Sequence, residues 1–265
     1  MGAGIRRAIV ERSWCAHVGH IGSSLSIADI LAALYGATLR SNGEDDPDRD
    51  RFILSKGHAA LALYAALKEA GQLSEEDLNT YCSDGTDLSG HPEHALGPVE
   101  FSTGSLGHGL PVGAGVALGA RLRGSPSRVF VLMSDAECNE GSVWEAAMFA
   151  AHHRLANLVA IVDANGQQAL GRTSEVLDLE PLSKRWEAFG WGAREVDGHD
   201  PVALAGELEE LDAGADRPHA FIARTTFGKG VSYMEGELQW HYWPMSDEQY
   251  GQAVRELDAA GGHGR

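Results

Sequence analysis

Short runs of consecutive apolar residues alternate along this chain with longer segments in which apolar residues recur every three or four positions. Runs of the first kind are typical of strands buried on both faces, and the longer spacing is typical of amphipathic helices. We therefore predict strands near 52–54, 129–133, 158–162, 192–196 and 219–224, the first at a sheet edge, and helices near 3–19, 27–35, 58–71, 110–122, 142–157, 182–189, 201–211 and 246–257.

The alternation of strands and helices over most of the chain predicts the fold class. A helix between two strands returns the chain to the same edge of the sheet, so that the strands run parallel. We expect an α/β fold, with a mostly parallel twisted sheet and helices on both faces. Residues 1–258 are expected to form a single domain, and the glycine-rich tail at 259–265 is expected to be disordered.

Residues that form turns and helix caps mark the segments between these elements. Ser24 or Ser26 is positioned to cap a following helix, and Ser74 precedes three acids that suit the first turn of a helix. The segments 83–105 and 226–237 are rich in turn formers. We predict a long loop in the first segment and a mobile loop in the second. Long loops in compact domains are often functional.

Oxygen-bearing side chains follow two of the predicted strands. Asp135 comes after the apolar run at 129–133, and Asn165 comes after the run at 158–162. The carboxyl ends of neighbouring parallel strands lie side by side, and ligands usually bind there. A carboxylate, an amide oxygen and a nearby backbone carbonyl suit Mg²⁺, which also takes oxygens from phosphate groups. The sequence therefore predicts a phosphorylated cofactor that is held through a metal ion.

Composition and charge exclude several classes of protein. The net charge of −17 disfavours binding to nucleic acid or to an anionic membrane through general electrostatic attraction. No run of about eighteen apolar residues occurs, so no segment is expected to span a membrane. The N-terminus lacks the apolar stretch of a secretory signal. The cysteines, Cys15, Cys82 and Cys138, are too far apart to indicate a zinc site or a disulfide framework, and we expect a cytoplasmic protein.

Several short motifs occur in order along nearly the whole chain. They are Val18-Gly19-His20-Ile21-Gly22, Leu54-Ser55-Lys56-Gly57-His58, Ser89-Gly90-His91-Pro92-Glu93, Thr103-Gly104-Ser105-Leu106-Gly107-His108-Gly109, Asp135 through Gly141, Asp163-Ala164-Asn165 and Val196-Asp197-Gly198-His199-Asp200. With these motifs the chain resembles the N-terminal, diphosphate-binding half of transketolase. The resemblance is greatest to the split form of that enzyme, in which the two halves are separate polypeptides.

The resemblance implies thiamine diphosphate as cofactor, together with Mg²⁺ or a similar cation such as Ca²⁺ or Mn²⁺. Asp135 and Asn165 would then bind the metal through their side chains, and Gln167 through its backbone carbonyl. The same resemblance implies that Gly104 and Leu106 face the cofactor beside its aminopyrimidine ring. The full set of implied cofactor-binding residues is His58, Gly104, Ser105, Leu106, Asp135, Ala136, Glu137, Asn165 and His241.

Four histidines are the catalytic residues that the resemblance implies. His20, His58, His91 and His241 would line the substrate channel and the diphosphate. Histidine suits the proton transfers that accompany carbon–carbon bond cleavage because its unperturbed pKa lies near neutrality. Imidazoles also donate hydrogen bonds to sugar hydroxyls and to developing alkoxides.

Two features depart from the family pattern. The chain has Ser134-Asp135-Ala136 where the family usually has Gly-Asp-Gly. Alanine adds a methyl group and disfavours positive φ. Ala136 therefore costs little if its φ is negative, and weakens cofactor binding if it is not. His108 stands where glutamine is common in the glycine-rich segment, which would alter contacts to substrate.

The resemblance also implies a partner subunit. In the family a glutamate from the second half activates the cofactor, and the matching region of this chain contains no such half. We expect a C-terminal subunit with the pyrimidine-binding domain, an active site at the interface between the two chains and an α2β2 heterotetramer. The glycine- and alanine-rich helix at 110–122 is a candidate for part of that interface.

Three hypotheses for function follow. The leading one is a transferase component that moves a two-carbon ketol unit from a ketose phosphate to an aldose phosphate or other aldehyde acceptor. The second is a keto-acid dehydrogenase-like component that passes a two-carbon unit to a lipoyl or carrier-protein arm. The third is a non-catalytic scaffold subunit. Ser134 and Ala136, which depart from the family pattern, are the reason to retain this hypothesis. The channel histidines favour the first, because they suit a polyol chain.

Overall fold

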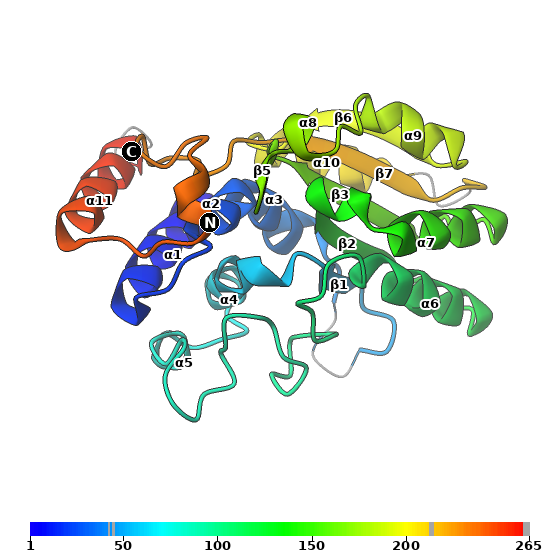
Figure 1. Ribbon diagram of the computed structural model, residues 1–265. Helices are drawn as coiled ribbons and strands as arrows, with labels where there is room; N and C mark the ends of the chain where they lie inside the picture. Colours follow the sequence, from blue (N-terminus) through cyan, green and yellow to red (C-terminus); the bar gives the residue numbers. More distant parts are fainter. Residues whose placement is uncertain (42, 44–45, 212–214, 262–265) are drawn as a thin grey trace.

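A five-stranded parallel sheet lies at the centre of the computed structural model, which describes residues 1–41, 43, 46–211 and 215–261 (Figure 1). Every strand pairing in this sheet is parallel, and Ser134 on the second strand is in register with Asp163 on the third. Across the sheet the strands are β1 (Arg51–Leu54), β2 (Val129–Ser134), β3 (Leu158–Ala164), β7 (His219–Arg224) and β6 (Gly192–Asp197).

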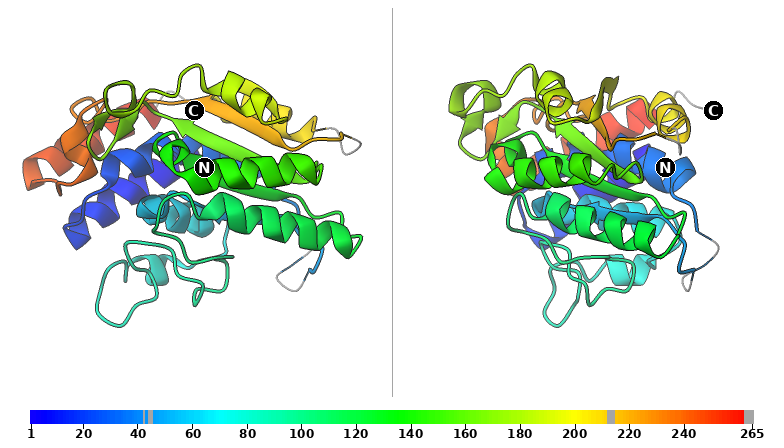
Figure 2. Two further views of the ribbon diagram at one scale, coloured as in Figure 1. Left: turned by 45° about the vertical axis from the view of Figure 1, so that its right-hand side comes forward. Right: turned by 90° about the vertical axis from the view of Figure 1, so that its right-hand side faces the viewer.

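Helices cover both faces of the sheet (Figure 2). Along β2 the side chains alternate between two cores, so that Phe130 and Leu132 pack on one face, and Val131 and Met133 on the other. The face of Phe130 is covered by α1 (Gly2–Ala16), α2 (Ile21–Ser26), α3 (Ala28–Ala33), α4 (Ala60–Glu69) and α10 (Pro201–Glu209), and the face of Val131 by α6 (Gly109–Leu122), α7 (Gly141–His152) and α9 (Leu182–Ala188).

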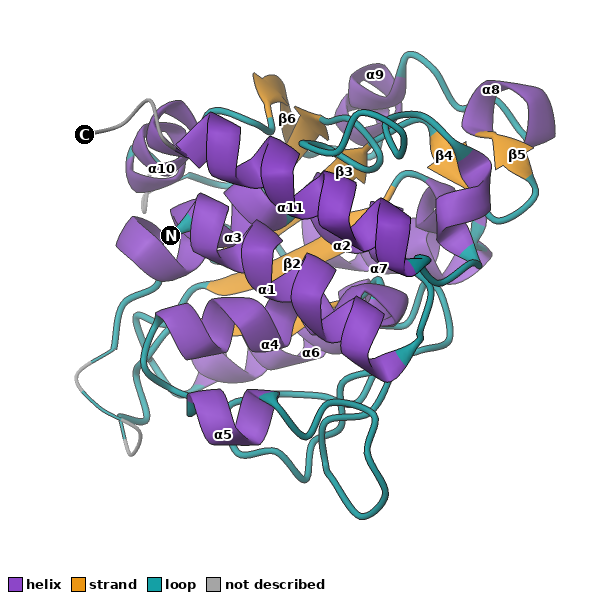
Figure 3. Cartoon of the chain, turned by 90° about the vertical axis from the view of Figure 1, so that its left-hand side faces the viewer, coloured by secondary structure: helices purple, strands orange, loops and turns teal. Residues whose placement is uncertain are grey.

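The remaining elements are short, apart from one long helix at the end of the chain. That helix, α11 (Asp247–Gly261), packs beside α1 (Figure 3). The short elements are α5 (Glu75–Leu78), α8 (Thr173–Val176), the antiparallel pair β4 (Gln167–Gln168) and β5 (Gly171–Arg172), a π-helix η1 (Leu34–Thr38), and the 3₁₀ turns η2 (Gly57–Ala59), η3 (Ala136–Asn139) and η4 (Leu238–His241).

The predicted fold class is confirmed, and each predicted strand is present, with β1 at an edge. The predicted cap of Ser74 is also confirmed, because its side chain accepts a hydrogen bond from the Asp77 amide. The predicted cap by Ser24 or Ser26 is wrong. Both lie inside α2, where the Ser24 hydroxyl donates to the His20 carbonyl and the Ser26 hydroxyl donates to Asp163.

Two predictions about loops and ends also need correction. The segment 226–237 has no helix or strand, as predicted, but it is not a free loop, since Phe227, Val231 and Met234 are buried in the core. The helix α11 continues to Gly261, so 259–261 are helical rather than disordered, and 262–265 lie outside the described residues. The long loop at 83–105 is confirmed. Within the described part of the chain, every helix is too short or too polar to cross a membrane.

Candidate functional site

The two predicted oxygen ligands lie at the carboxyl ends of adjacent strands. Asp135 directly follows β2, and Asn165 directly follows β3. The backbone amide of Asp135 donates to the carbonyl of Asp163 over 3.2 Å, and the Asp135 carboxylate accepts from the backbone amide of Gly166 over 2.9 Å. The predicted meeting of these two strand ends is confirmed.

The Asp135 carboxylate is buried, and burial favours its protonated form. Burial, and then the nearby charge of Asp163, raise the pKa of Asp135 to about 7. Hydrogen bonds from the amides of Gly166 and Ala136, and the charge of Lys56, act in the opposite direction without overcoming burial. A bound divalent cation would supply the missing positive charge at this point.

The orientation of the Asn165 amide is fixed by its two partners. Its Nδ2 donates to Asp163 Oδ2 over 2.8 Å, and its Oδ1 accepts from the backbone amide of Gln167 over 2.9 Å. A carbonyl oxygen has two lone pairs, so Oδ1 retains one for a cation. No group of three or more His, Cys, Asp or Glu side chains in the described part of the chain is arranged to hold a metal. The predicted set of one carboxylate, one amide and one backbone carbonyl instead fits a hard cation that shares phosphate oxygens.

The alanine that replaces the family glycine does not strain the backbone. Ala136 opens the 3₁₀ turn η3, and its φ is not positive. The methyl group therefore carries no backbone penalty here. The sequence left open whether Ala136 has a negative or a positive φ, and the structure shows that it is not positive.

Three of the four predicted catalytic histidines form a ring cluster. The ring centroids of His20 and His241 are 5.0 Å apart. The ring centroid of His58 lies 5.4 Å from each of these two. His91 approaches the cluster from the long loop and lies beside Gly104, where an added Cβ would be 3.2 Å from His91 Cδ2. The fold thus brings together histidines from four distant segments.

Burial favours the neutral form of the three clustered histidines. It is the main cause that lowers the pKa of His20, of His58 and of His241, the last to about 4. The charge of Lys56 adds to the effect on each of them. Neutral imidazole has one donor and one acceptor nitrogen, as hydrogen bonding and proton exchange with a polyol require.

Two ring nitrogens in the cluster have no hydrogen-bond partner. The Nδ1 atoms of His20 and His241 are buried and unpartnered, whereas His58 Nε2 lies 2.8 Å from the Ser23 hydroxyl. An unsatisfied buried polar atom costs about 1–3 kcal/mol. Such atoms are retained at binding sites because a ligand satisfies them.

Backbone features position the cluster. His20 has φ 60° and ψ 21°, a left-handed conformation that is uncommon for a residue with a side chain and that clusters at functional sites. A Cβ on Gly19 would lie 2.3 Å from the carbonyl oxygen of Tyr242, so only glycine allows this approach. Gly57 likewise has no room for a Cβ against the backbone of Thr103, and this contact sets His58 beside the glycine-rich loop.

The glycine-rich loop is anchored on both sides of its exposed residues. The Thr103 hydroxyl donates to the Leu54 carbonyl over 2.6 Å, and the Gly107 amide donates to Glu137 over 2.9 Å. Between these anchors the predicted cofactor-binding residues include the exposed Gly104 and Ser105 and the half-buried Leu106.

The Glu137 carboxylate has a structural role beside the site. Its side chain is completely buried, with Oε1 accepting from the Ser55 hydroxyl and the Gly107 amide, and Oε2 accepting from the Ser134 amide. Both oxygens are used to join β1, β2 and the glycine-rich loop. The Glu137 carboxylate therefore holds the walls of the site together, and its predicted binding of the cofactor stays a prediction.

Sequence reasoning missed the ion pair between Lys56 and Asp163. Both side chains are fully buried, and Asp163 is also bonded by Ser26, Asn165 and Thr225. The available signal was a charged residue in each of two motifs: Lys56 within residues 54–58 and Asp163 within residues 163–165. Such a pair survives burial only when it is well hydrogen-bonded.

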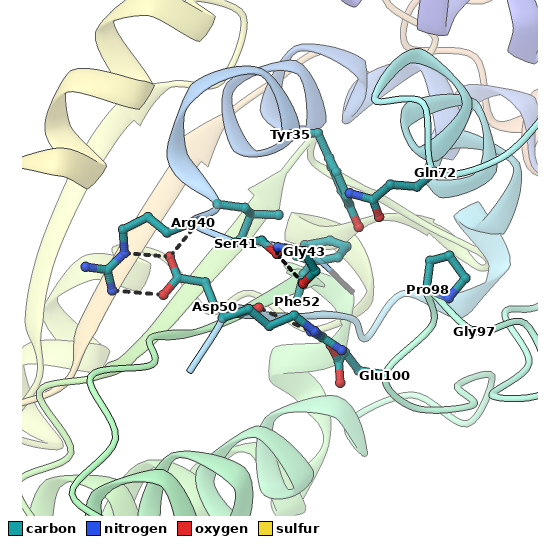
Figure 4. Close-up of a pocket in the computed structure, with 12 residues that line it drawn as sticks. Tyr35, Arg40, Ser41, Gly43, Asp50, Phe52, Gln72, Gly97, Pro98 and Glu100 are labelled. Carbon is teal, nitrogen blue, oxygen red and sulfur yellow. Dashed lines mark hydrogen bonds and ion pairs between the residues drawn. The ribbon is translucent and has the colours of Figure 1, made fainter. Parts of the chain in front are cut away.

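A cavity of about 380 Å³ lies at the other end of β1 and is separate from this site (Figure 4). Tyr35 and Phe52 form part of its apolar wall. Among the charged residues that line it, Arg40 is paired with Asp50, and Arg49 with Glu100. Since Asp50 directly precedes β1, the cavity lies at the amino-terminal end of the strand, away from the histidine cluster.

Comparison with known sequences gives one family. The sequence model described as transketolase, thiamine diphosphate binding domain, matches residues 4–260. One of the subunits of an apulose-4-phosphate transketolase from Phocaeicola vulgatus is 43% identical over 254 residues, which cover 95% of this chain and 90% of that protein. A 6-deoxy-6-sulfo-D-fructose transketolase subunit from a Clostridium species is 38% identical over 261 residues, which cover 97% of this chain and 94% of that one.

Solved structures agree on the fold. Transketolase from Campylobacter jejuni superposes with a TM-score of 0.88 at 28% identity, covering 98% of this chain and 42% of that chain. A Pichia stipitis transketolase variant in complex with fructose 6-phosphate gives a TM-score of 0.89 at 30% identity, covering 98% and 40%. The chain thus spans about two-fifths of these transketolases, but nearly the whole of the two subunit relatives.

Proposed function

The chain belongs to the transketolase family, as a thiamine diphosphate-binding domain, and from this we propose that it is the N-terminal subunit of a split transketolase. It would move a two-carbon ketol unit from a ketose phosphate to an aldehyde acceptor. The observation that carries the proposal is the convergence of a partly buried histidine cluster and the Asp135–Asn165 strand ends at one edge of the sheet. The names of the two subunit relatives support the split arrangement.

The residues at the strand ends fit the diphosphate with its cation. Asp135 and Asn165 would bind Mg²⁺ through side-chain oxygens, and Gln167 through its carbonyl. Thiamine diphosphate, when bound, supplies the carbanion stabilisation that this chemistry needs. The protein contributes binding and position: the strand ends hold the cation, and the exposed backbone of Gly104 and Ser105 leaves room for the cofactor.

The histidines would handle the substrate. The adjacent rings of His20 and His241 would form hydrogen bonds with sugar hydroxyls and exchange protons with them. His58, held by Ser23, would keep a fixed ring orientation toward the diphosphate. His91 would contribute from the exposed loop, where its side chain can reach a substrate that enters from solvent.

One surface suits the partner subunit. Val116 on α6 and Met148 and Phe149 on α7 are 37%, 54% and 40% exposed, and the two helices lie side by side on the surface (Figure 2). Nothing lies within 4 Å of a Cβ added at Gly115, so this part of α6 is open to close approach by another chain. We propose that this α6–α7 face contacts a C-terminal, pyrimidine-binding subunit in an α2β2 heterotetramer.

Other proposed features concern location. The cysteines described by the structure, Cys15, Cys82 and Cys138, are all free. Free thiols persist in reducing compartments, which supports a cytoplasmic enzyme. The net charge of −17 supports the expectation that nucleic acid and anionic membranes are not partners.

Reconstitution tests the proposal. The purified chain and a candidate pyrimidine-binding partner are assayed separately and together, with thiamine diphosphate, Mg²⁺, a ketose phosphate and an aldose acceptor. Turnover should require both chains, and His20→Ala should lower kcat/KM by about a hundredfold or more, within the range for a lost acid–base group. His17→Ala, which replaces an exposed histidine at the end of α1 outside the cluster and outside the α6–α7 face, is the matched control.

The alternatives give different results in the same assay. Transfer to a lipoyl carrier but not to an aldose would favour the dehydrogenase-like component. Calorimetry measures whether thiamine diphosphate binds to the complex in a metal-dependent way. If it does not bind, only the hypothesis of a non-catalytic scaffold subunit remains. Full turnover by this chain alone would contradict the split arrangement.

A further inference from the structure

A lysine and an aspartate form a fully buried ion pair behind the proposed cation site. Lys56 Nζ lies 2.5 Å from Asp163 Oδ2, and both side chains have 0% exposure. Lys56 follows β1 and Asp163 lies on β3, so the lysine side chain reaches across the end of β2, which separates those strands. An isolated charge in such a position is very unfavourable, so a buried ion pair of this kind requires both partners.

The carboxylate of Asp163 is crowded with donors. Its Oδ2 accepts from Lys56, from the Ser26 hydroxyl over 2.7 Å and from Asn165 Nδ2 over 2.8 Å, and its Oδ1 accepts from the Thr225 hydroxyl. An ionised carboxylate has acceptors only. The amide of Asn165 must therefore turn its NH₂ group toward Asp163 and its oxygen to the opposite side.

The opposite side is where the cation is proposed to bind. Asn165 Oδ1 there accepts from the backbone amide of Gln167, the residue whose carbonyl belongs to the proposed ligand set. Rotating the amide by half a turn would present NH₂ to the cation and place two oxygens against each other at Asp163. The carboxylate thus selects between a binding and a repelling orientation of the ligand.

We propose that Asp163 is a positioning residue, which fixes the oxygen of Asn165 toward the cation, and that Lys56 holds the Asp163 carboxylate in place through the buried ion pair. The inference rests on the proposed function and deepens it, because it assigns a role to two residues outside the expected ligand and catalytic sets. A hydrogen-bonded partner behind a metal ligand typically changes metal affinity by about 10–100-fold when it is removed.

The test measures Mn²⁺ affinity by electron paramagnetic resonance, with the full chain, thiamine diphosphate and the partner subunit. Three variants are compared with the wild type: Asp163→Asn, Lys56→Met and the double variant. Asp163→Asn removes both the positioning carboxylate and one negative charge. The double variant removes the carboxylate but restores the net charge of the cluster, which separates positioning from simple attraction.

Positioning by Asp163 predicts that Mn²⁺ affinity falls by about tenfold or more in Asp163→Asn and stays reduced in the double variant. Asparagine at 163 can donate or accept, so it no longer selects the orientation of Asn165. Lys56→Met retains the carboxylate and should bind Mn²⁺ at least as well as the double variant. Thermal unfolding of each variant is measured in parallel, and the double variant should be more stable than either single one because no unpaired charge is buried.

A matched control removes a different hydrogen bond to Asp163. Thr225→Val removes a hydrogen bond from the same carboxylate without touching Asn165, and should leave Mn²⁺ affinity within about twofold of the wild type. Wild-type affinity in the double variant would overturn the inference, since charge or stability alone would then explain the single variants. A wild-type complex that binds no Mn²⁺ would overturn the proposed function, and this inference with it.

Discussion

The backbone amide of His20 donates a hydrogen bond to the carbonyl of His241 over 3.2 Å, although the two residues lie near opposite ends of the chain. Their rings meet edge to face, with centroids 5.0 Å apart. A substrate that contacts both rings therefore depends on how the two ends of the chain are joined. The site is assembled by long-range packing, and no single local motif contains it.

The packing of α1 against α11 supports this junction. The Trp14 ring stacks on the Tyr250 ring with centroids 4.3 Å apart, and Arg7 pairs with Asp258 over 2.6 Å. The stacked rings help to hold the segment after α1, which bears His20, near the segment before α11, which bears His241. The relative position of the two histidines is set by the helix pair as well as by their own bond.

Gly19→Ala is expected to disturb this junction. The added Cβ would lie 2.3 Å from the carbonyl oxygen of Tyr242, so the backbone must move, and overpacking of this kind costs about 1–3 kcal/mol. Urea unfolding measures the loss of stability, and kcat/KM of the reconstituted enzyme should fall with it. Gly206→Ala is the control, because no atom lies within 4 Å of the added Cβ, and alanine in α10 should stabilise by about 0.5–1 kcal/mol.

His241 should make stability depend on pH. Burial, the neighbouring His20 and the charge of Lys56 lower its pKa to about 4, below the unfolded value near 6.5. The unfolded chain then binds a proton first as the pH falls, so stability should decline from about pH 6.5 to about pH 4 and then level off. Urea midpoints across this range, compared with those of His241→Phe, measure the effect. A proton NMR titration that places the His241 midpoint near 6.5 would contradict it.

The sequence predicted the sheet and the meeting of the two strand ends because both depend on local pattern. The apolar runs at 129–133 and 158–162 are long enough to mark buried strands, and Asp135 and Asn165 immediately follow strands that turned out to be neighbours. The motif resemblance placed four histidines in the site, and the fold brings their segments together.

The missed features depend on three-dimensional partners. Ser26 looks like a helix cap in sequence, but its hydroxyl is bound to Asp163, which belongs to a strand far along the chain. The Glu137 carboxylate accepts hydrogen bonds from Ser55 and Gly107, which lie far from it in the sequence. The segment 226–237 looks mobile from its glycines, although three apolar residues within it anchor it to the core. Local pattern carries no information about these contacts.

Asp29 is expected to stabilise the folded chain above about pH 4. Burial alone would raise its pKa, but hydrogen bonds from His199 and Arg6 outweigh burial and lower it to about 2. Because the unfolded value is about 3.9, stability should be fully present above that pH and be lost as the pH falls toward 2. Asp29→Asn should destabilise by about 3–5 kcal/mol at pH 7, since it leaves Arg6 unpaired in a mostly buried position.

The control for Asp29 is an exposed ion pair. Asp258→Asn removes the partner of Arg7, and the Asp258 side chain is 65% exposed. Such pairs contribute about 0–1 kcal/mol, so this variant should unfold at nearly the wild-type urea concentration. Equal losses in the two variants would show that burial of the Asp29 pair has no special effect.

Ser23 is expected to orient His58. Its hydroxyl lies 2.8 Å from His58 Nε2, and Ser23 is almost completely buried. Ser23→Ala should cost about 0.5–1.5 kcal/mol in stability, the usual net value of one hydrogen bond, and should raise KM as the ring loses its fixed orientation. Ser127→Ala, at the amino-terminal end of β2, removes a similarly buried hydroxyl far from the site. A rise in KM for both variants would refute a specific role for Ser23.

Asp135 is expected to lower the stability of the chain without its cofactor while enabling it to bind a cation. Its folded pKa of about 7 lies above the unfolded value of about 3.9, so stability is fully present below pH 4 and should be lost as the pH rises toward 7. Asp135→Asn should therefore melt higher than the wild type at about pH 7.5 when cofactor and Mg²⁺ are removed by dialysis against a chelator.

Adding thiamine diphosphate and Mg²⁺ should reverse that order. The wild type should gain stability in proportion to ligand concentration, because binding to the folded state alone adds stability by mass action. Asp135→Asn should show no Mg²⁺-dependent gain, since the amide carries no charge to offset that of the cation. An equal rise in melting temperature for both proteins would show that residue 135 does not bind the cation.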